Sequence, residues 1–203
     1  MNIREKITII LLSCGLILAL LPLTGNRSFT VSPKKLLTEA FDEKSFFTAD
    51  QVARFVATED TSVLLIDLRT PEEFSKLNIP GSVNIPYTSF IEIAPGTITG
   101  KENIKNILYS NGDIDANSAW IIAKGLKINN IYVMKGGLNE WFSKVMNSRF
   151  SGERISAREN ALFENRRRAG QIFTEMNSLP NSLKRKYFEA RNVAAKKLDG
   201  GCE

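Results

Sequence analysis

Short apolar runs alternate with polar, amphipathic stretches through the middle of the chain. Runs of three or four apolar residues are typical of strands that are buried on both faces of a parallel sheet. Such runs occur at Val63–Ile66, Ile107–Tyr109 and Ile131–Met134, and Ser82–Pro86 indicates a further short strand. Strands that alternate with helices predict a three-layer α/β domain with a mostly parallel central sheet.

Two of the intervening stretches begin with helix-start signals. Thr48 with Gln51 three residues later is a capping-box pattern, which predicts a helix through about residue 57. Thr70, Pro71 and Glu73 supply an N-cap, a proline at the first helical position and a capping glutamate. A second helix is therefore expected from residue 71 to about residue 77.

The central strand ends at Ser110, where small and polar residues turn the chain toward a helix expected over Ala116–Gly125. Ligands of α/β folds usually lie outside the carboxyl ends of the strands, and a helix N-terminus presents N–H groups to them. We therefore predict a ligand loop of six consecutive residues: Ser110, Asn111, Gly112, Asp113, Ile114 and Asp115. Upstream of the central strand, a loop is expected around Pro95-Gly96.

The polar residues of this loop admit alternative interpretations. Ser110 is either a hydroxyl donor in a ligand cradle or a relic that caps the following helix. The spacing of Asp113, Asp115 and Asn117 is similar to a calcium loop, but the glycine and terminal glutamate of such loops are missing. We interpret both aspartates as solvated turn residues, and no metal or cofactor is expected.

Composition narrows the chemistry further. The 203 residues include no histidine, which removes the commonest general base and the commonest zinc ligand. The formal net charge of +5 is too mild to indicate a nucleic-acid partner. The two cysteines, Cys14 and Cys202, lie near opposite ends of the chain and imply no disulfide framework.

Both ends of the chain extend beyond the α/β pattern. Arg4 and Lys6 precede an apolar stretch at residues 7–23, so residues 1–25 are predicted to be a signal peptide or a membrane anchor. The folded part would then lie outside the cytoplasm, anchored to the membrane or secreted after cleavage. Residues 26–45 are expected to form a linker with a short helix.

Residues 149–203 are predicted to be a helical extension. Apolar residues recur every seven positions from Ile155 to Met176, Pro180 breaks the pattern, and a basic amphipathic stretch follows over Leu183–Leu198. Two helices that pack on the α/β body are the default expectation. Cys202 is either a surrogate thiol for chemistry at the loop or an exposed terminal cysteine without a role.

Four motifs in this order resemble the rhodanese-like domain family. They are Asp67-Leu68-Arg69, Thr70–Phe74, Ile79–Pro86, and Gly136-Gly137 with Trp141. The resemblance covers about Phe46–Lys144, and we place the domain at residues 46–148. It implies the rhodanese-like fold and sulfur transfer, in which a cysteine at the end of the central strand carries sulfane sulfur. We interpret Asp67 and Arg69 as structural, and Gly136, Gly137 and Trp141 as turn and core residues.

The sequence departs from the family at the decisive position, because Ser110 stands where active members have cysteine. A serine hydroxyl is a far weaker acid than a thiol and cannot hold a persulfide. The first hypothesis is an envelope protein without the usual catalysis, which binds an unknown protein partner or small ligand at residues 110–115. The second is a sulfurtransferase that works through Cys202. Serine-based hydrolysis is disfavoured because no histidine is present to act as the base.

Overall fold

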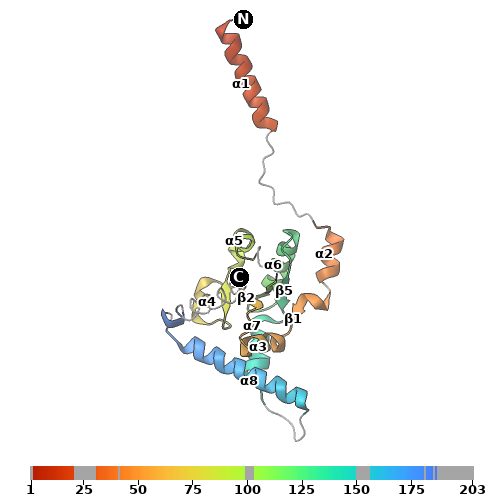
Figure 1. Ribbon diagram of the computed structural model, residues 1–203, viewed down its shortest axis with the longest axis vertical. Coiled ribbons are helices and arrows are strands. Elements are labelled where there is room, and N and C mark those ends of the chain that lie inside the picture. The colour runs from red at the N-terminus through yellow and green to blue at the C-terminus, as the bar shows by residue number, and fades with distance from the viewer. Residues whose placement is uncertain are drawn as a thin grey trace, which may run out of the picture.

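The computed structural model describes residues 2–20, 31–40, 42–98, 103–149, 156–180, 182–184 and 186. Its centre is a five-stranded sheet in which every neighbouring pair of strands is parallel, in the order β1-β5-β4-β2-β3. Figure 1 labels β1, β2 and β5 at the centre of the body, among the surrounding helices. The strands are β1 (Phe46–Phe47), β2 (Val63–Asp67), β3 (Ser82–Asn84), β4 (Lys105–Tyr109) and β5 (Ile131–Met134). The predicted parallel α/β architecture is therefore confirmed.

Helices connect the strands and continue beyond them. The α-helices are α1 (Ile3–Leu20), α2 (Pro33–Ala40), α3 (Ala49–Ala57), α4 (Pro71–Lys76), α5 (Phe90–Ile98), α6 (Ile114–Gly125), α7 (Gly137–Trp141) and α8 (Ala157–Ser178). Short 3-10 turns lie at η1 (Glu43–Ser45) and η2 (Tyr87–Ser89), and a π-helical turn at η3 (Phe142–Met146) follows α7.

The sheet divides the core into two apolar layers. Successive residues of a strand point to opposite faces, so Ile107 and Tyr109 join the layer covered by α3, α7 and α8. Leu108 between them joins the layer covered by α5 and α6. The same division separates Leu65 from Ile66 on β2. Both faces of the central strands are therefore buried, which explains their continuous apolar runs.

The two predicted helix starts have the expected geometry. The Thr48 hydroxyl accepts from the Gln51 N–H, and the Gln51 side chain accepts from the Thr48 N–H. The same reciprocal pair joins Thr70 and Glu73, with Pro71 at the first helical position. Each pair satisfies two N–H groups that have no partner within the helix.

Two predictions of local structure were wrong. The stretch around Pro95 forms part of α5 rather than a loop, because Phe90, Ala94 and Ile98 bury one face of a helix and outweigh the hydrogen bond that proline cannot donate. Helix α6 begins at Ile114, two residues earlier than expected, because Asp113 already has helical backbone angles. Asp115 therefore belongs to the first turn of α6.

The described helix of the C-terminal extension, α8, packs on the body, as expected. Ala169, Phe173 and Met176 of α8 are buried, and Phe173 lies against Trp141 with ring centroids 5.8 Å apart. Arg166 forms a two-pronged ion pair with Asp50 of α3, which α8 crosses (Figure 1). Ile155 and most of the predicted second helix, Leu183–Leu198, lie outside the described residues.

The N-terminal prediction finds less support. Helix α1 carries Arg4, Glu5 and Lys6 near its start, and within the described ranges no helix has both the length and the apolarity to cross a membrane. The expected membrane-spanning helix is therefore not found there. Residues 21–30 lie outside the described part of the chain.

Candidate functional site

Three strands end side by side at the edge that the sequence analysis selected. The register places Asp67 of β2 beside both Tyr109 of β4 and Asn84 of β3. The Asn84 side chain donates to the carbonyl oxygens of Asp67 and Arg69, at 3.0 and 2.8 Å. Ser110 follows Tyr109 directly, so the predicted loop begins at the carboxyl edge of the sheet.

The Ser110 side chain is buried and committed to a partner within the loop. Only 3% of Ser110 is exposed, and its Oγ donates to Oδ2 of Asp115 over 3.0 Å. Ser110 is therefore not the cap of α6, which begins after Asp113 without a side-chain cap. Instead, its hydroxyl points into the first turn of that helix.

The first residues of α7 and the turn before it hold the loop from the other side. The N–H groups of Leu138 and Asn139 donate to the carbonyl oxygens of Ser110 and Asn111, at 2.9 and 3.0 Å. The N–H of Gly136 donates to Oδ1 of Asp113 over 2.6 Å. Asp113 is therefore exposed but not free, which corrects its interpretation as a purely solvated turn residue.

Close packing at this turn requires a glycine. Gly137 has a φ angle of +53°, and a β-carbon there would lie 2.4 Å from the carbonyl oxygen of Ser110. Such a distance is far inside van der Waals contact, so an L-residue cannot occupy this position without moving the loop. The Gly136-Gly137 pair thus sets the distance between α7 and the loop, while Trp141 is fully buried below it.

Helix α4 makes a third contact with the loop. The Asn111 side chain donates to Oε1 of Glu73 over 3.1 Å, while the other carboxylate oxygen of Glu73 accepts from the Thr70 N–H. These hydrogen bonds, the one from Asn111 foremost, lower the pKa of Glu73. The capping residue of α4 therefore also orients the second residue of the loop.

The Asp67–Arg69 pair lies beneath this edge. Asp67 is fully buried, Arg69 is nearly so, and the Arg69 guanidinium donates to Oδ2 of Asp67 over 2.6 Å. The same guanidinium nitrogen, Nη2, also donates to the carbonyl oxygen of Leu77 at 2.6 Å. Both charges are buried, and the guanidinium contacts Asp67 and Leu77, so the pair ties the end of β2 to the segment after α4.

Tyr109 is a site residue that the sequence analysis did not single out. Its phenolic oxygen accepts from the Ile79 N–H at 3.2 Å and donates to Oγ of Ser82 at 2.9 Å. Burial, and then the nearby Asp67 carboxylate, raise the pKa of Tyr109 well above its ordinary value. A polar aromatic residue closing an otherwise apolar strand was the signal that could have identified it.

The remaining candidates are metal-ligating clusters, the two cysteines and the apolar residue of the loop. In the described residues, no cluster of three or more histidine, cysteine, aspartate or glutamate side chains could hold a metal ion. Cys14 lies in α1, and Cys202 lies outside the described residues. Loop residue Ile114 is 83% exposed and offers an apolar side chain beside the two aspartates.

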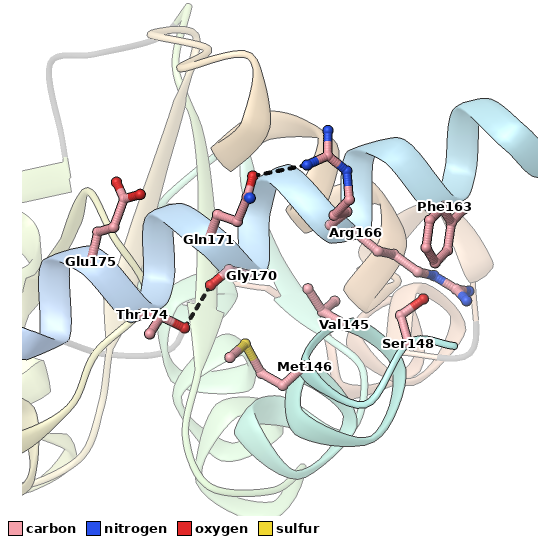
Figure 2. A pocket seen from close by; sticks show the side chains of 10 residues that line it. Val145, Met146, Ser148, Phe163, Arg166, Gly170, Gln171, Thr174 and Glu175 are labelled. Atoms are coloured by element: carbon pink, nitrogen blue, oxygen red, sulfur yellow. Dashed lines mark hydrogen bonds between the residues drawn. The ribbon is translucent and has the colours of Figure 1, made fainter. Parts of the chain in front are cut away.

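A pocket of about 390 Å³ lies elsewhere, between α8 and η3 (Figure 2). Its apolar wall includes Val145, Met146 and Phe163, and Gly170 opens the space along α8. No residue of the Ser110–Asp115 loop lines it. The pocket is therefore separate from the predicted ligand loop.

Comparison with known proteins supports the sequence resemblance. Residues 48–144 match the family model described as the rhodanese-like domain. A mitochondrial thiosulfate sulfurtransferase of Saccharomyces cerevisiae is 29% identical over 139 residues, which cover 60% of this chain and 91% of that protein. A thiosulfate:glutathione sulfurtransferase of the same yeast is 40% identical over 43 residues, covering 21% and 31% of the two chains.

Among solved structures, a rhodanese-like domain from Anabaena is similar with a TM-score of 0.43 and 13% identity, covering 56% of this chain and 92% of that domain. The matched residues contain the whole run from the Thr48 capping box to the end of α7, including the loop after β4. Helix α8 lies beyond the match. The central part of this chain is thus a rhodanese-like domain with sulfurtransferase homologues.

Proposed function

We propose that this protein is a rhodanese-like binding or regulatory module of the cell envelope, without thiosulfate sulfurtransferase activity at the Ser110 loop. The observation that carries the proposal is the hydrogen bond from the Ser110 hydroxyl to the Asp115 carboxylate. Oxygen at this position cannot accept sulfane sulfur as a persulfide. A hydroxyl also needs a strong adjacent base to become a nucleophile.

The charges around Ser110 support the same proposal. The carboxylates of Asp113 and Asp115 lie within the loop, and Glu73 contacts Asn111. A dianion such as thiosulfate would be repelled by these groups, by about 1 kcal/mol or more for each charge at contact distance. A neutral or cationic group, or a protein segment that also covers exposed Ile114, fits the loop better.

A sulfur-transfer assay tests the proposal. Purified protein is supplied with thiosulfate and cyanide, and thiocyanate is measured. We expect no turnover above background. Turnover that disappears in Cys202→Ser would instead support a sulfurtransferase using Cys202, a possibility to which the two yeast relatives lend weight. Turnover that survives Cys202→Ser would overturn both proposals.

Two further measurements address the remaining alternatives. An activated phosphonate should leave Ser110 unlabelled, because no histidine is present to act as the base and the partly buried Asp115 carboxylate is a weak one. Labelling would indicate a serine hydrolase. The envelope location rests on Arg4 and Lys6 before apolar residues, and cell fractionation with sequencing of the mature N-terminus tests it. Recovery of the intact chain in the cytoplasmic fraction would contradict it.

A further inference from the structure

Three consecutive residues between α4 and β3 each contact a different part of the molecule. The carbonyl oxygen of Leu77 accepts from the Arg69 guanidinium, and the N–H of Ile79 donates to the phenolic oxygen of Tyr109. Asn78 between them is 4% exposed. We call residues 77–79 the linker. The linker thereby connects Arg69, which follows β2, with Tyr109, which is the last residue of β4. These two strands carry the site.

Among the hydrogen bonds of the described residues, those that reach the linker from outside the rhodanese-like domain come from one side chain of α8, Asn177. The Asn177 carboxamide of α8 accepts from the Asn78 N–H at 3.0 Å and donates to the Asn78 carbonyl oxygen at 2.9 Å. It thus pairs with the backbone of Asn78 as a neighbouring strand would. A second donor bond to the carbonyl oxygen of Phe173, at 2.8 Å, fixes the orientation of the carboxamide on α8.

Helix α8 provides a firm support for Asn177. Phe173, one turn earlier, is buried against Trp141, and the Arg166–Asp50 ion pair joins the helix to α3. Beyond Pro180, the buried Lys184 ammonium lies 3.4 Å from the carbonyl oxygens of Ser75 and Lys76 at the end of α4. A cation is favourable there, because carbonyl oxygens at a helix C-terminus carry partial negative charge.

We infer that Asn177 is a positioning residue for the Ser110 loop, acting through the linker and Tyr109. This inference rests on the proposed function for its choice of site, but the contacts stand without it. Tyr109 immediately precedes Ser110, and its phenol depends on Ile79 and Ser82 for its position. Loss of the Asn177 pair therefore frees the linker first, then the Tyr109 side chain, and finally the loop. The C-terminal extension sets the geometry of a site that the family domain carries.

Amide hydrogen exchange in the full chain tests this inference without any ligand. The probes are the N–H of Ile79 in the linker and the N–H groups of Leu138 and Asn139, which bond the loop carbonyls. The reference is β5. In Asn177→Ala we expect exchange at all three probes to rise about tenfold while β5 is unchanged. Asn177→Asp keeps an acceptor for the Asn78 N–H but sets a carboxylate oxygen against the carbonyl oxygens of Asn78 and Phe173, so exchange at the same three probes should rise at least as much.

Two controls separate positioning from general loss of stability. The Thr174 hydroxyl donates to the carbonyl oxygen of Gly170 in its own helix. Thr174→Ala removes this contact and should leave exchange at every probe unchanged. Met176→Ala creates a cavity under α8 and should raise exchange at β5 as well. The inference is wrong if Asn177→Ala raises the exchange rate equally at all amides, if it raises exchange only at Ile79, or if neither Asn177 variant folds. None of these measurements depends on sulfur transfer, so failure of this inference can be distinguished from failure of the proposed function.

Discussion

The Ser110 hydroxyl donates to the Asp115 carboxylate across the first turn of α6, with 3.0 Å between Oγ and Oδ2. The residue that directly follows the central strand is thereby paired with a negative charge. In a sulfur-carrying loop the same place must favour a thiolate and an anionic donor. A carboxylate beside residue 110 and a thiolate at residue 110 disfavour each other. Converting the loop to a sulfur carrier therefore needs two changes, a thiol in place of the hydroxyl and removal of the carboxylate charge.

The first prediction is that Ser110→Cys gives a sluggish thiol and that adding Asp115→Asn activates it. The Asp115 carboxylate disfavours a neighbouring thiolate, and its neutralisation should lower the thiol pKa by about one unit. Alkylation by iodoacetamide, measured against pH in protein carrying Cys14→Ser and Cys202→Ser, reports that pKa. Persulfide formation from thiosulfate should rise about tenfold in the double variant.

Glu175→Gln provides the matched control for this charge effect. Glu175 lies on α8 beside the separate pocket, so its neutralisation removes one negative charge without touching the loop. It should leave the alkylation profile of Ser110→Cys unchanged. Equal acceleration by Glu175→Gln and Asp115→Asn would mean that net charge, rather than the loop carboxylate, controls the thiol.

The second prediction concerns the contact between Gly137 and the loop. Gly137→Ala places a β-carbon 2.4 Å from the Ser110 carbonyl at a φ angle of +53°. We expect the free energy of unfolding to fall by about 3 kcal/mol, measured by urea denaturation. Gly96→Ala is the control, because nothing lies within 4 Å of its new β-carbon in α5. It should stabilise the chain by up to about 1 kcal/mol. Similar losses in both variants would contradict this explanation.

The parts of the fold that the sequence predicted are those set by neighbours along the chain. The Thr48 and Thr70 capping boxes involve residues three apart, and both are present. The apolar runs of β2, β4 and β5 required only burial on both faces. Their order in the sheet places Asp67 beside Tyr109, so the predicted edge and the loop that begins at Ser110 follow from the same pattern.

The missed features depend on residues distant in sequence or on competition between local effects. Asn78 and Asn177 are 99 residues apart, and neither has a pattern that indicates the other. Asp113 was expected in a loop, but its side chain accepts from Gly136, 23 residues later, and its backbone is already helical. At Pro95 the burial of Phe90 and Ala94 outweighed the turn signal of the proline.

The third prediction is an alkaline loss of stability that depends on Tyr109. Burial raises the pKa of Tyr109 well above its ordinary value near 10. The unfolded chain therefore releases this proton at a lower pH than the folded chain does. The contribution of the phenol to stability is complete below about pH 10 and is lost as the pH rises further.

Urea denaturation between pH 7 and pH 11 measures this effect. Tyr109→Phe should lower the free energy of unfolding by about 1–2 kcal/mol at pH 7, because the Ile79 N–H and the Ser82 hydroxyl lose their partner. The same variant should have a flatter decline above pH 10. Tyr87→Phe, at a residue that is 37% exposed, is the control. An alkaline decline that is equally steep in Tyr109→Phe would rule out Tyr109 as its source.

The fourth prediction is that the Asp67–Arg69 pair is needed as a pair rather than as two charges. Both residues are buried, so Arg69→Met leaves the Asp67 carboxylate without its guanidinium and should cost about 3–5 kcal/mol. Asp67→Leu combined with Arg69→Met removes both charges and should recover much of that loss, because the desolvation of both ions is avoided. The exposed Arg167–Glu164 pair on α8, with both side chains about half exposed, should contribute only about 0–1 kcal/mol in the same double-mutant cycle. If the buried and exposed pairs gave equal coupling energies, the burial of Asp67 would have no energetic consequence.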